Sequence, residues 1–201
     1  MNTNDSNVFE KNGCFLIKNF FEKNIVAIFS QYLENKINRG EWTQYDDITD
    51  YAYYADPLSE VFLLNKKQDL EKKLCKELLP TYSFVRVYQP GESLEDHVDR
   101  PSCEITVSVN IASVGPSSPL FMKYKDLPVF EYNLHPGDAV VYKGIEVRHW
   151  RHKFLKNQLN AQVMLHYVDK NNKYSCWEKD GRLAYGLPSD LDIIKKPDKF
   201  V

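Results

Sequence analysis

Residues 83–110 read SFVRVYQPGESLEDHVDRPSCEITVSVN and carry the pattern that decides the fold. The first six residues alternate between apolar and polar side chains, as a half-buried strand does, and Gln89-Pro90-Gly91-Glu92 is a turn signal. The alternation returns over residues 104–110, with aliphatic side chains on one face and Thr, Ser and Asn on the other. The segment therefore predicts two strands of a half-polar sheet.

Between these two predicted strands, His97 and Asp99 place an imidazole and a carboxylate close together, and His149 follows about fifty residues later. Two neutral imidazoles and one carboxylate bind one face of Fe(II) and leave the opposite positions open, as an oxygenase requires. The spacing therefore predicts a mononuclear iron site with these three ligands. Alternatively, His97 and Asp99 form a hydrogen-bonded surface pair and His149 is a packed imidazole.

The sequence after residue 134 predicts the rest of the sheet. Residues 135–138 (HPGD) read as a turn, residues 139–142 as a short buried strand, and His149 lies on the strand that follows. The last strand covers residues 160–168, and one of its faces carries Asn160, Gln162, Met164 and His166. Polar groups aimed into a barrel predict a ligand cavity rather than a closed core. We expect His166 to line this cavity.

The N-terminal part predicts elements that support the sheet. Residues 13–17 read as an opening strand, and apolar side chains recur at helical spacing over residues 25–37. Asp56 and Pro57 indicate the N-cap and first residue of a second helix that continues to Leu78. The stretch between the helices is predicted to be irregular, forming a wall over the barrel mouth or packing on the sheet. It contains Tyr45, Asp46, Asp47, Asp50, Tyr51, Tyr53 and Tyr54.

Composition sets the class of protein. The 201 residues suit one domain, with a strand and helices over 13–79, a barrel core over about 81–169 and a C-terminal extension over 170–201. A formal net charge of -2 gives no global attraction to nucleic acid or to a membrane. Without a signal-peptide pattern, a long apolar run or a CxxC pair, the sequence predicts a cytoplasmic protein with reduced thiols.

Taken in order, these motifs resemble the Fe(II)/2-oxoglutarate-dependent dioxygenases, and within them the small prolyl-4-hydroxylase-like group. The resemblance runs from about Thr81 to Asp169, close to half of the chain. It is carried by Tyr88-Gln89-Pro90-Gly91, His97-Val98-Asp99, the strand ending in Asn110, Pro136-Gly137-Asp138 and His149. The resemblance implies a double-stranded β-helix, a jelly-roll barrel of the cupin type, with helices packed on one sheet.

The resemblance also implies an activity. In that family 2-oxoglutarate chelates Fe(II) opposite the three protein ligands, and with O2 it yields succinate and CO2 while the substrate is hydroxylated; ascorbate is a further expected cofactor. Because halogenating relatives replace the carboxylate ligand with a small residue, Asp99 favours hydroxylation, with desaturation or ring closure as alternatives. The expected substrate is an aliphatic C–H bond of an amino-acid-like, peptidyl or other small molecule.

The chain departs from the family at the cosubstrate anchor. In prolyl-hydroxylase-like enzymes a Lys or Arg about ten residues past the distal His pairs with the far carboxylate of 2-oxoglutarate. Here residues 158–161 read QLNA, without a cation. Because a buried carboxylate without a partner is unfavourable, another residue must supply the charge. The departure leaves open a cupin-like metalloenzyme that does not use 2-oxoglutarate, or a non-catalytic ligand-binding barrel.

Three arginines are candidates for the missing charge. Arg86 shares strand parity with Tyr88, whose family counterpart points into the cosubstrate pocket, and Arg151 shares parity with His149. Arg100 follows the predicted ligand Asp99 near the mouth, where it would bind a substrate carboxylate or phosphate. For each arginine a surface salt bridge is the alternative. The predicted cosubstrate-binding residues are Arg86, Tyr88, Arg151 and, as a neutral hydrogen-bond donor, Asn160. The sequence leaves the oligomeric state open.

Overall fold

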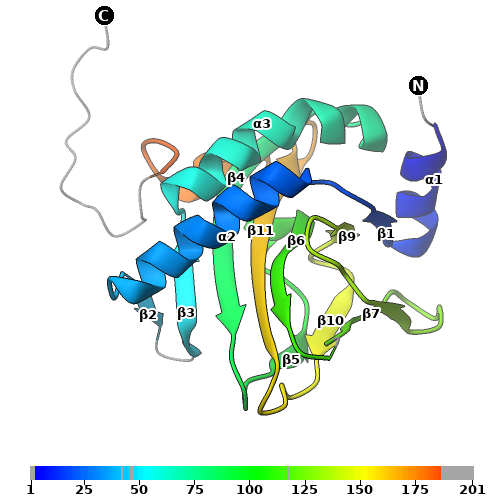
Figure 1. Ribbon diagram of the computed structural model, residues 1–201. Coiled ribbons are helices and arrows are strands. Elements are labelled where there is room, and N and C mark those ends of the chain that lie inside the picture. Colours follow the sequence, from blue (N-terminus) through cyan, green and yellow to red (C-terminus); the bar gives the residue numbers. More distant parts are fainter. Residues whose placement is uncertain (1–2, 42, 46–47, 117, 187–201) are drawn as a thin grey trace, which may run out of the picture.

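The structure, a computed structural model, describes residues 3–41, 43–45, 48–116 and 118–186 (Figure 1). Its strands form two antiparallel sheets. The larger sheet contains β1 (Cys14–Ile17), β2 (Thr43–Tyr45), β3 (Ile48–Tyr54), β4 (Leu78–Tyr88), β6 (Ile105–Val114), β9 (Ala139–Lys143) and β11 (Leu159–Asp169), in the order β1-β9-β6-β11-β4-β3-β2. The smaller sheet contains β5 (Leu94–His97), β7 (Leu120–Lys123), β8 (Phe130–Tyr132) and β10 (Arg148–Arg151), in the order β5-β10-β7-β8.

Helices cover one face of the larger sheet. Figure 1 shows α2 (Lys23–Asn38) and α3 (Pro57–Leu74) crossing this face, with α1 (Thr3–Asn12) near β1. Buried apolar side chains of α2 and α3 pack against the aliphatic side chains of β4, β6 and β11 in one continuous core. The core therefore lies between the helices and the sheet, and the opposite face of the sheet is left for a cavity.

Strand β11 shows how the sequence divides these two faces. Ala161, Val163, Leu165 and Tyr167 belong to the core, and Gln162, Met164 and His166 line the cavity on the other side. This is the period of two that the sequence predicted for residues 160–168. The predicted strands at residues 83–88, 104–110 and 139–142 and the double-stranded β-helix are likewise confirmed.

Two predictions for the N-terminal part were wrong. The second helix starts at Pro57 with Asp56 as its N-cap, as predicted, but it ends at Leu74 because Cys75 takes a left-handed conformation with φ 53°. Leu78 instead begins β4. The stretch between the helices is not an irregular loop: β3 pairs with β4, Tyr53 is buried in the core, and β2 adds the edge strand. Asp46 and Asp47 lie outside the described residues.

The C-terminal extension is joined to the barrel through buried charges. After β11 a 3-10 segment covers Lys173–Gly181, and the next residue, Arg182, is buried. Its guanidinium group donates to Glu60 Oε1 of α3 at 2.6 Å and to the backbone oxygen of Thr81 at 2.7 Å. Residues 187–201 of the predicted extension lie outside the described residues.

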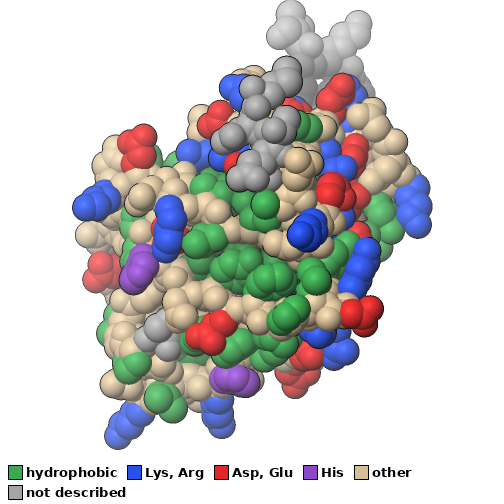
Figure 2. Space-filling view, turned by 90° about the vertical axis from the view of Figure 1, so that its right-hand side faces the viewer, with side chains coloured by type: hydrophobic (Ala, Val, Ile, Leu, Met, Phe, Trp, Pro, Cys, Tyr) green, Lys and Arg blue, Asp and Glu red, His purple; other side chains and the backbone are tan. Residues whose placement is uncertain are grey.

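The surface bears charges of both signs. Figure 2 shows a band of hydrophobic side chains across one face, with Lys, Arg, Asp and Glu side chains interspersed around it. The charges therefore partly cancel over this face, in keeping with the formal net charge of -2. Among the described helices, none has both the length and the apolar composition that crossing a bilayer requires.

Candidate active site

Strand pairing places the two predicted histidine ligands beside each other. His97 ends β5, His149 lies in β10, and the two residues are direct partners in the antiparallel pairing. Directly opposed residues on neighbouring antiparallel strands have adjacent side chains on the same face. The ring centroids of His97 and His149 are 4.3 Å apart. This cross-strand pair therefore brings together two histidines that lie about fifty residues apart in the sequence.

Asp99 is held against this histidine pair by a glycine. The backbone N–H of Asp99 donates to the backbone oxygen of Gly144, at the end of β9, over 2.8 Å. A Cβ atom at Gly144 would lie 2.0 Å from the backbone oxygen of Cys103 and 2.6 Å from Asp99 Oδ2, so only glycine fits there. Asp99 Oδ1 lies 3.7 Å from His97 Nε2 and 3.6 Å from His149 Nε2.

The geometry of these three residues suits a metal ion. One ligand atom from each lies within 4.8 Å of the others. His97 Nδ1 is 2.8 Å from the backbone oxygen of Glu95, and His149 Nδ1 is 3.1 Å from that of Val147. If each Nδ1 carries the hydrogen of such a bond, each Nε2 keeps its lone pair for a metal.

Burial and charge act in opposite directions on the pKa values of the two candidate histidine ligands. Burial lowers the pKa of His149, so this imidazole is neutral. Burial alone would raise the pKa of Asp99, but the approach of His97 and the nearby His149 and His166 hold it below its usual value. The approach of Asp99 in turn raises the pKa of His97, against the effect of burial. Asp99 is therefore ionised at neutral pH.

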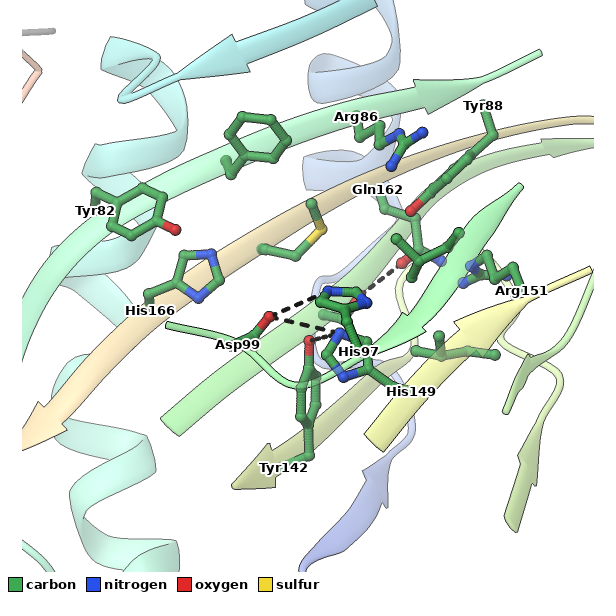
Figure 3. Close-up of a pocket in the computed structure, with 15 residues that line it drawn as sticks. Tyr82, Arg86, Tyr88, His97, Asp99, Tyr142, His149, Arg151, Gln162 and His166 are labelled. Carbon is green, nitrogen blue, oxygen red and sulfur yellow. Dashed lines mark hydrogen bonds and ion pairs between the residues drawn. The ribbon is translucent and has the colours of Figure 1, made fainter. Parts of the chain in front are cut away.

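A cavity of about 230 Å³ opens between the two sheets beside this cluster (Figure 3). In Figure 3 the candidate ligands lie between Tyr82 and His166 on one side and Arg86, Tyr88 and Arg151 on the other. Tyr82, Phe84, Met164 and His166 form a wall from β4 and β11, and Tyr88, Arg86, Gln162 and Arg151 form the end with the positive charges. The cavity thus has a basic end and, away from it, a region with the metal-binding cluster, called the metal end below.

Arg151 at the basic end is a buried cation that forms no ion pair within the described part of the chain. Its exposed fraction is 3%, and its Nη1 donates to the backbone oxygen of Ser118. Its Nε and Nη2 atoms have no hydrogen-bond partner in the part of the chain that the structure describes. Burial lowers the pKa of Arg151 to about 10, so it is still charged at neutral pH. A buried unpaired charge is unfavourable, which indicates that an anion binds here.

Two neighbours reinforce this basic end. Gln162 accepts a hydrogen bond from Ser108 at 2.6 Å through Oε1, and its buried Nε2 has no partner among the described residues. The Tyr88 ring lies 4.4 Å from the Arg86 guanidinium carbon and 5.7 Å from that of Arg151. Arg86 also donates to the backbone oxygen of Ser93 at 3.4 Å and is half-buried. Of these two arginines, Arg151 is the fully buried one, and two of its nitrogens have no hydrogen-bond partner among the described residues.

Comparison with known proteins gives a clear answer for the fold. No family model and no curated protein matches the sequence. A Pseudomonas putida prolyl-4-hydroxylase has a similar structure, with a TM-score of 0.66, 14% identity and coverage of 83% of this chain and 98% of that one. A non-haem α-ketoglutarate-dependent epimerase from nogalamycin biosynthesis has a TM-score of 0.68, 12% identity and coverage of 82% and 80%.

A third similar structure was solved with ligands. It comes from Streptomyces hygroscopicus, contains nickel and 2-oxoglutarate, and has a TM-score of 0.65, 11% identity and coverage of 82% of this chain and 86% of that one. The chain has the fold of the 2-oxoglutarate-dependent oxygenases. At these identities the likeness establishes the fold, and the activity has to be argued from the side chains.

Two residues predicted from the oxygenase resemblance lie away from the cavity with the metal cluster. Asn160 Nδ2 donates to Asn110 Oδ1 at 3.1 Å and to Ser113 Oγ at 2.9 Å, and the side chain lines a second cavity on the far side of Arg151. Arg100 does not line the main cavity either. Its guanidinium group binds both carboxylate oxygens of Asp180 in the C-terminal extension, at 2.9 and 2.6 Å.

Two other histidines, His152 and His166, lie near the barrel cavity or on its outside. His152 is exposed and packs on Phe121, at 4.7 Å between ring centroids, so it is not part of the cluster. His166 lines the cavity, as predicted, and its ring packs on Tyr82 at 4.4 Å. Burial lowers the pKa of His166 to about 4, so its imidazole is neutral.

Three residues that shape the site were not predicted from the sequence. Tyr142 is buried with its hydroxyl group 3.4 Å from His149 Nε2, Gln162 lies beside Arg151, and Thr106 donates to Asp99 Oδ2 at 3.0 Å. Strand parity had placed Gln162 and Thr106 on polar faces, which is the signal that was available. Their partners depend on the pairing of β6 with β9 and β11, which parity alone does not reveal.

Proposed function

We propose that the protein is an Fe(II)- and 2-oxoglutarate-dependent dioxygenase that hydroxylates an aliphatic C–H bond of an amino-acid-like or peptidyl substrate and releases succinate and CO2. The main evidence is that one cavity holds a His-Asp-His cluster and, at its basic end, a buried guanidinium group of which two nitrogens have no partner among the described residues. A small molecule with a metal-chelating group and a distal carboxylate would satisfy both ends at once. 2-Oxoglutarate has these two groups.

The residues present fit the metal. His97, Asp99 and His149 offer two imidazole nitrogens and one ionised carboxylate from one side, which is the donor set of non-haem Fe(II) oxygenases. Fe(II), when bound with O2, would supply the oxidising chemistry that replaces a C–H bond by C–OH, and ascorbate would keep the iron reduced. Backbone oxygens of Glu95 and Val147 orient the two imidazoles for this role.

The basic end fits the distal carboxylate of 2-oxoglutarate. Arg151 Nε and Nη2 can donate to its two oxygens, and Gln162 Nε2 is a third donor without a partner among the described residues. Tyr88 lines the same end of the cavity. Arg151 thus replaces the cation that related enzymes place on the next strand. Arg86 and Asn160 stay predictions with a smaller role, because Arg86 and the Nδ2 donor of Asn160 already have protein partners.

The substrate would enter beside the aromatic wall. Tyr82, Phe84 and Met164 offer apolar surface next to the metal-binding cluster, and neutral His166 adds one polar group. Such a wall suits an aliphatic side chain carrying the C–H bond to be oxidised. Arg100, predicted to bind a substrate carboxylate or phosphate, could do so only in competition with Asp180. The expected cytoplasmic location also stays a prediction.

Turnover of 2-oxoglutarate tests this function directly. Purified protein is incubated with Fe(II), ascorbate, O2 and 2-oxoglutarate, alone and with amino acids and peptides, and succinate is measured. We expect slow succinate formation by the protein alone, stimulation by the true substrate, and none from a variant with alanine at all three metal-ligand positions. Bound iron without succinate under any condition would instead favour the cupin-like metalloenzyme or the ligand-binding barrel.

A further inference from the structure

Thr106 lies on the cavity side of the larger sheet, between the candidate ligand Asp99 and His166. It is fully buried on β6 and is the direct strand partner of His166 on β11 and of Tyr142 on β9. Its hydroxyl oxygen is 3.0 Å from Asp99 Oδ2, 3.0 Å from His166 Nδ1 and 3.3 Å from the backbone oxygen of Cys103. One hydroxyl group therefore connects a candidate metal ligand to a second imidazole of the cavity.

The number of available hydrogens determines the direction of the hydrogen bonds that Thr106 forms with Asp99 and with His166. A threonine hydroxyl has one hydrogen to donate, and an ionised carboxylate can only accept. The bond to Asp99 is charge-assisted and shorter than the contact with Cys103, so the hydrogen of Thr106 points to Asp99. Thr106 Oγ1 must then accept the hydrogen of His166 Nδ1. In an imidazole whose single hydrogen lies on Nδ1, the Nε2 atom carries a lone pair.

The same contact determines which carboxylate oxygen faces the metal site. Oδ2 of Asp99 is occupied by Thr106, and Oδ1 is the oxygen that lies 3.6–3.7 Å from the Nε2 atoms of His149 and His97. Rotation of the carboxylate would break the bond to Thr106. Gly144 leaves room for this arrangement, since a Cβ atom there would lie 2.6 Å from Asp99 Oδ2 and 2.9 Å from Thr106 Oγ1. The bond to Thr106 thus holds the orientation of the carboxylate.

We propose that Thr106 is a positioning residue that holds Asp99 with Oδ1 toward the two histidines, and that His166 orders this bond by donating from Nδ1. His166 then presents Nε2 to the cavity as a hydrogen-bond acceptor for an N–H or O–H group. The proposal deepens the proposed function, since it requires Asp99 to bind the metal. According to this proposal, the buried pair of Thr106 and His166 contributes to metal affinity and not only to folding.

Metal affinity measured without 2-oxoglutarate tests the proposal. Thr106→Val keeps the shape and removes the hydroxyl group, whereas Thr106→Ser keeps the donor. Loss of a hydrogen bond to a metal ligand typically weakens metal binding about 10–100-fold, and we expect that loss of Mn(II) affinity for Thr106→Val, measured by calorimetry. Thr106→Ser should bind Mn(II) nearly as well as the wild type.

A matched control separates this effect from a general loss of packing. Thr81 is also a fully buried threonine, and its hydroxyl donates at 2.7 Å to the backbone oxygen of Ser102. Thr81→Val should lose folding stability but keep its Mn(II) affinity. Equal affinity of Thr106→Val and the wild type would overturn this proposal alone, whereas a wild type that does not bind Mn(II) would overturn the proposed function with it.

Which nitrogen of His166 carries the hydrogen can be measured in the wild-type protein, and a variant is needed only to assign the signals. Nitrogen-15 NMR of the metal-free protein distinguishes the two neutral tautomers of an imidazole. The signals of His166 are assigned by their loss in His166→Gln. We expect the hydrogen on Nδ1 and none on Nε2. A hydrogen on Nε2 of His166 instead would show that Thr106 does not accept a hydrogen bond from Nδ1. This result would overturn the proposed hydrogen-bond directions.

Discussion

The two ends of the cavity differ in how their polar groups are satisfied. Around the candidate ligand Asp99, the hydroxyl of Thr106 and the Nδ1 atom of His166 both have a partner. At the other end, two nitrogens of Arg151 and one of Gln162 are buried without a partner in the described chain. Both ends are built from the same two sheets, so the difference does not follow from the fold alone.

This difference indicates where a ligand must supply the missing contacts. A fully paired group contributes to the folded protein by itself, whereas an unpaired buried donor or charge costs stability until a ligand arrives. The metal end is therefore arranged before binding. The basic end is destabilising without its anion, which is the expected signature of a binding site rather than of a structural ion pair.

The largest effect is expected from the metal end. Alanine at His97, Asp99 or His149 removes one of only three protein ligands, so stoichiometric binding of Fe(II) or Mn(II) should be lost. His152→Ala is the matched control, because the imidazole of His152 packs on Phe121. This variant should bind one equivalent of metal. Metal content after dialysis and calorimetry measure both. Stoichiometric metal in the triple-alanine protein would show that the ligands lie elsewhere.

Arg151→Leu should act in opposite directions on binding and on folding. Removal of one partner of a buried charge pair costs about 3–5 kcal/mol, so the dissociation constant for 2-oxoglutarate should rise at least about a hundredfold. The metal-free, ligand-free variant should unfold at a higher urea concentration than the wild type, because it no longer buries an unpaired cation. Arg86→Leu, at a half-buried and hydrogen-bonded position, should weaken 2-oxoglutarate binding only a few-fold. If Arg86→Leu caused the larger loss, the anchor would be misassigned.

Gln162→Leu should have an intermediate effect. A hydrogen bond to a charged group contributes about 1.5–3 kcal/mol, so loss of the third donor should weaken 2-oxoglutarate binding at least about tenfold. Metal affinity should stay unchanged, because Gln162 does not contact the three candidate ligands. Titration of 2-oxoglutarate into the Mn(II)-loaded variant and wild type measures the change in dissociation constant. Binding as tight as in the wild type would mean that the amide faces away from the carboxylate.

Arg100→Leu should have the smallest effect and should act on stability. The side chain is 47% exposed and pairs with Asp180, which also accepts from Tyr54, so its loss should cost about 1 kcal/mol of unfolding free energy. Affinity for 2-oxoglutarate should be unaffected. Urea unfolding and the same titration measure the two quantities. A large loss of 2-oxoglutarate affinity would place the cosubstrate at the end of the cavity near Tyr82.

Alternation in the sequence was sufficient to predict which face of each strand lines the cavity, because parity is a local property. Gln162, Met164 and His166 were placed correctly on this ground. Parity could not separate Arg86 from Arg151, since both point inward and only the packing of neighbours shows that one of them is fully buried. The pair of Arg100 with Asp180 joins residues 80 positions apart and has no local signal.

The second helix and the tyrosine-rich stretch show the same limit in the supporting elements. Leu70, Leu74 and Leu78 continue a helical period, but the chain turns at Cys75 and Leu78 enters the sheet. The segment around Tyr53 has no clear alternation of its own and becomes a strand because β4 offers it an edge to pair with. In both segments the pairing of strands in the folded protein, rather than the local sequence pattern, determined the secondary structure.

Anaerobic titration of 2-oxoglutarate into the wild-type protein loaded with Fe(II) tests the central claim most directly. We predict a metal-to-ligand absorption band that saturates at one equivalent of 2-oxoglutarate, as expected when the keto-acid group chelates the iron and Arg151 holds the far carboxylate. A protein that binds one Fe(II) through His97, Asp99 and His149 but shows no spectral change and no heat of binding with 2-oxoglutarate would contradict the account.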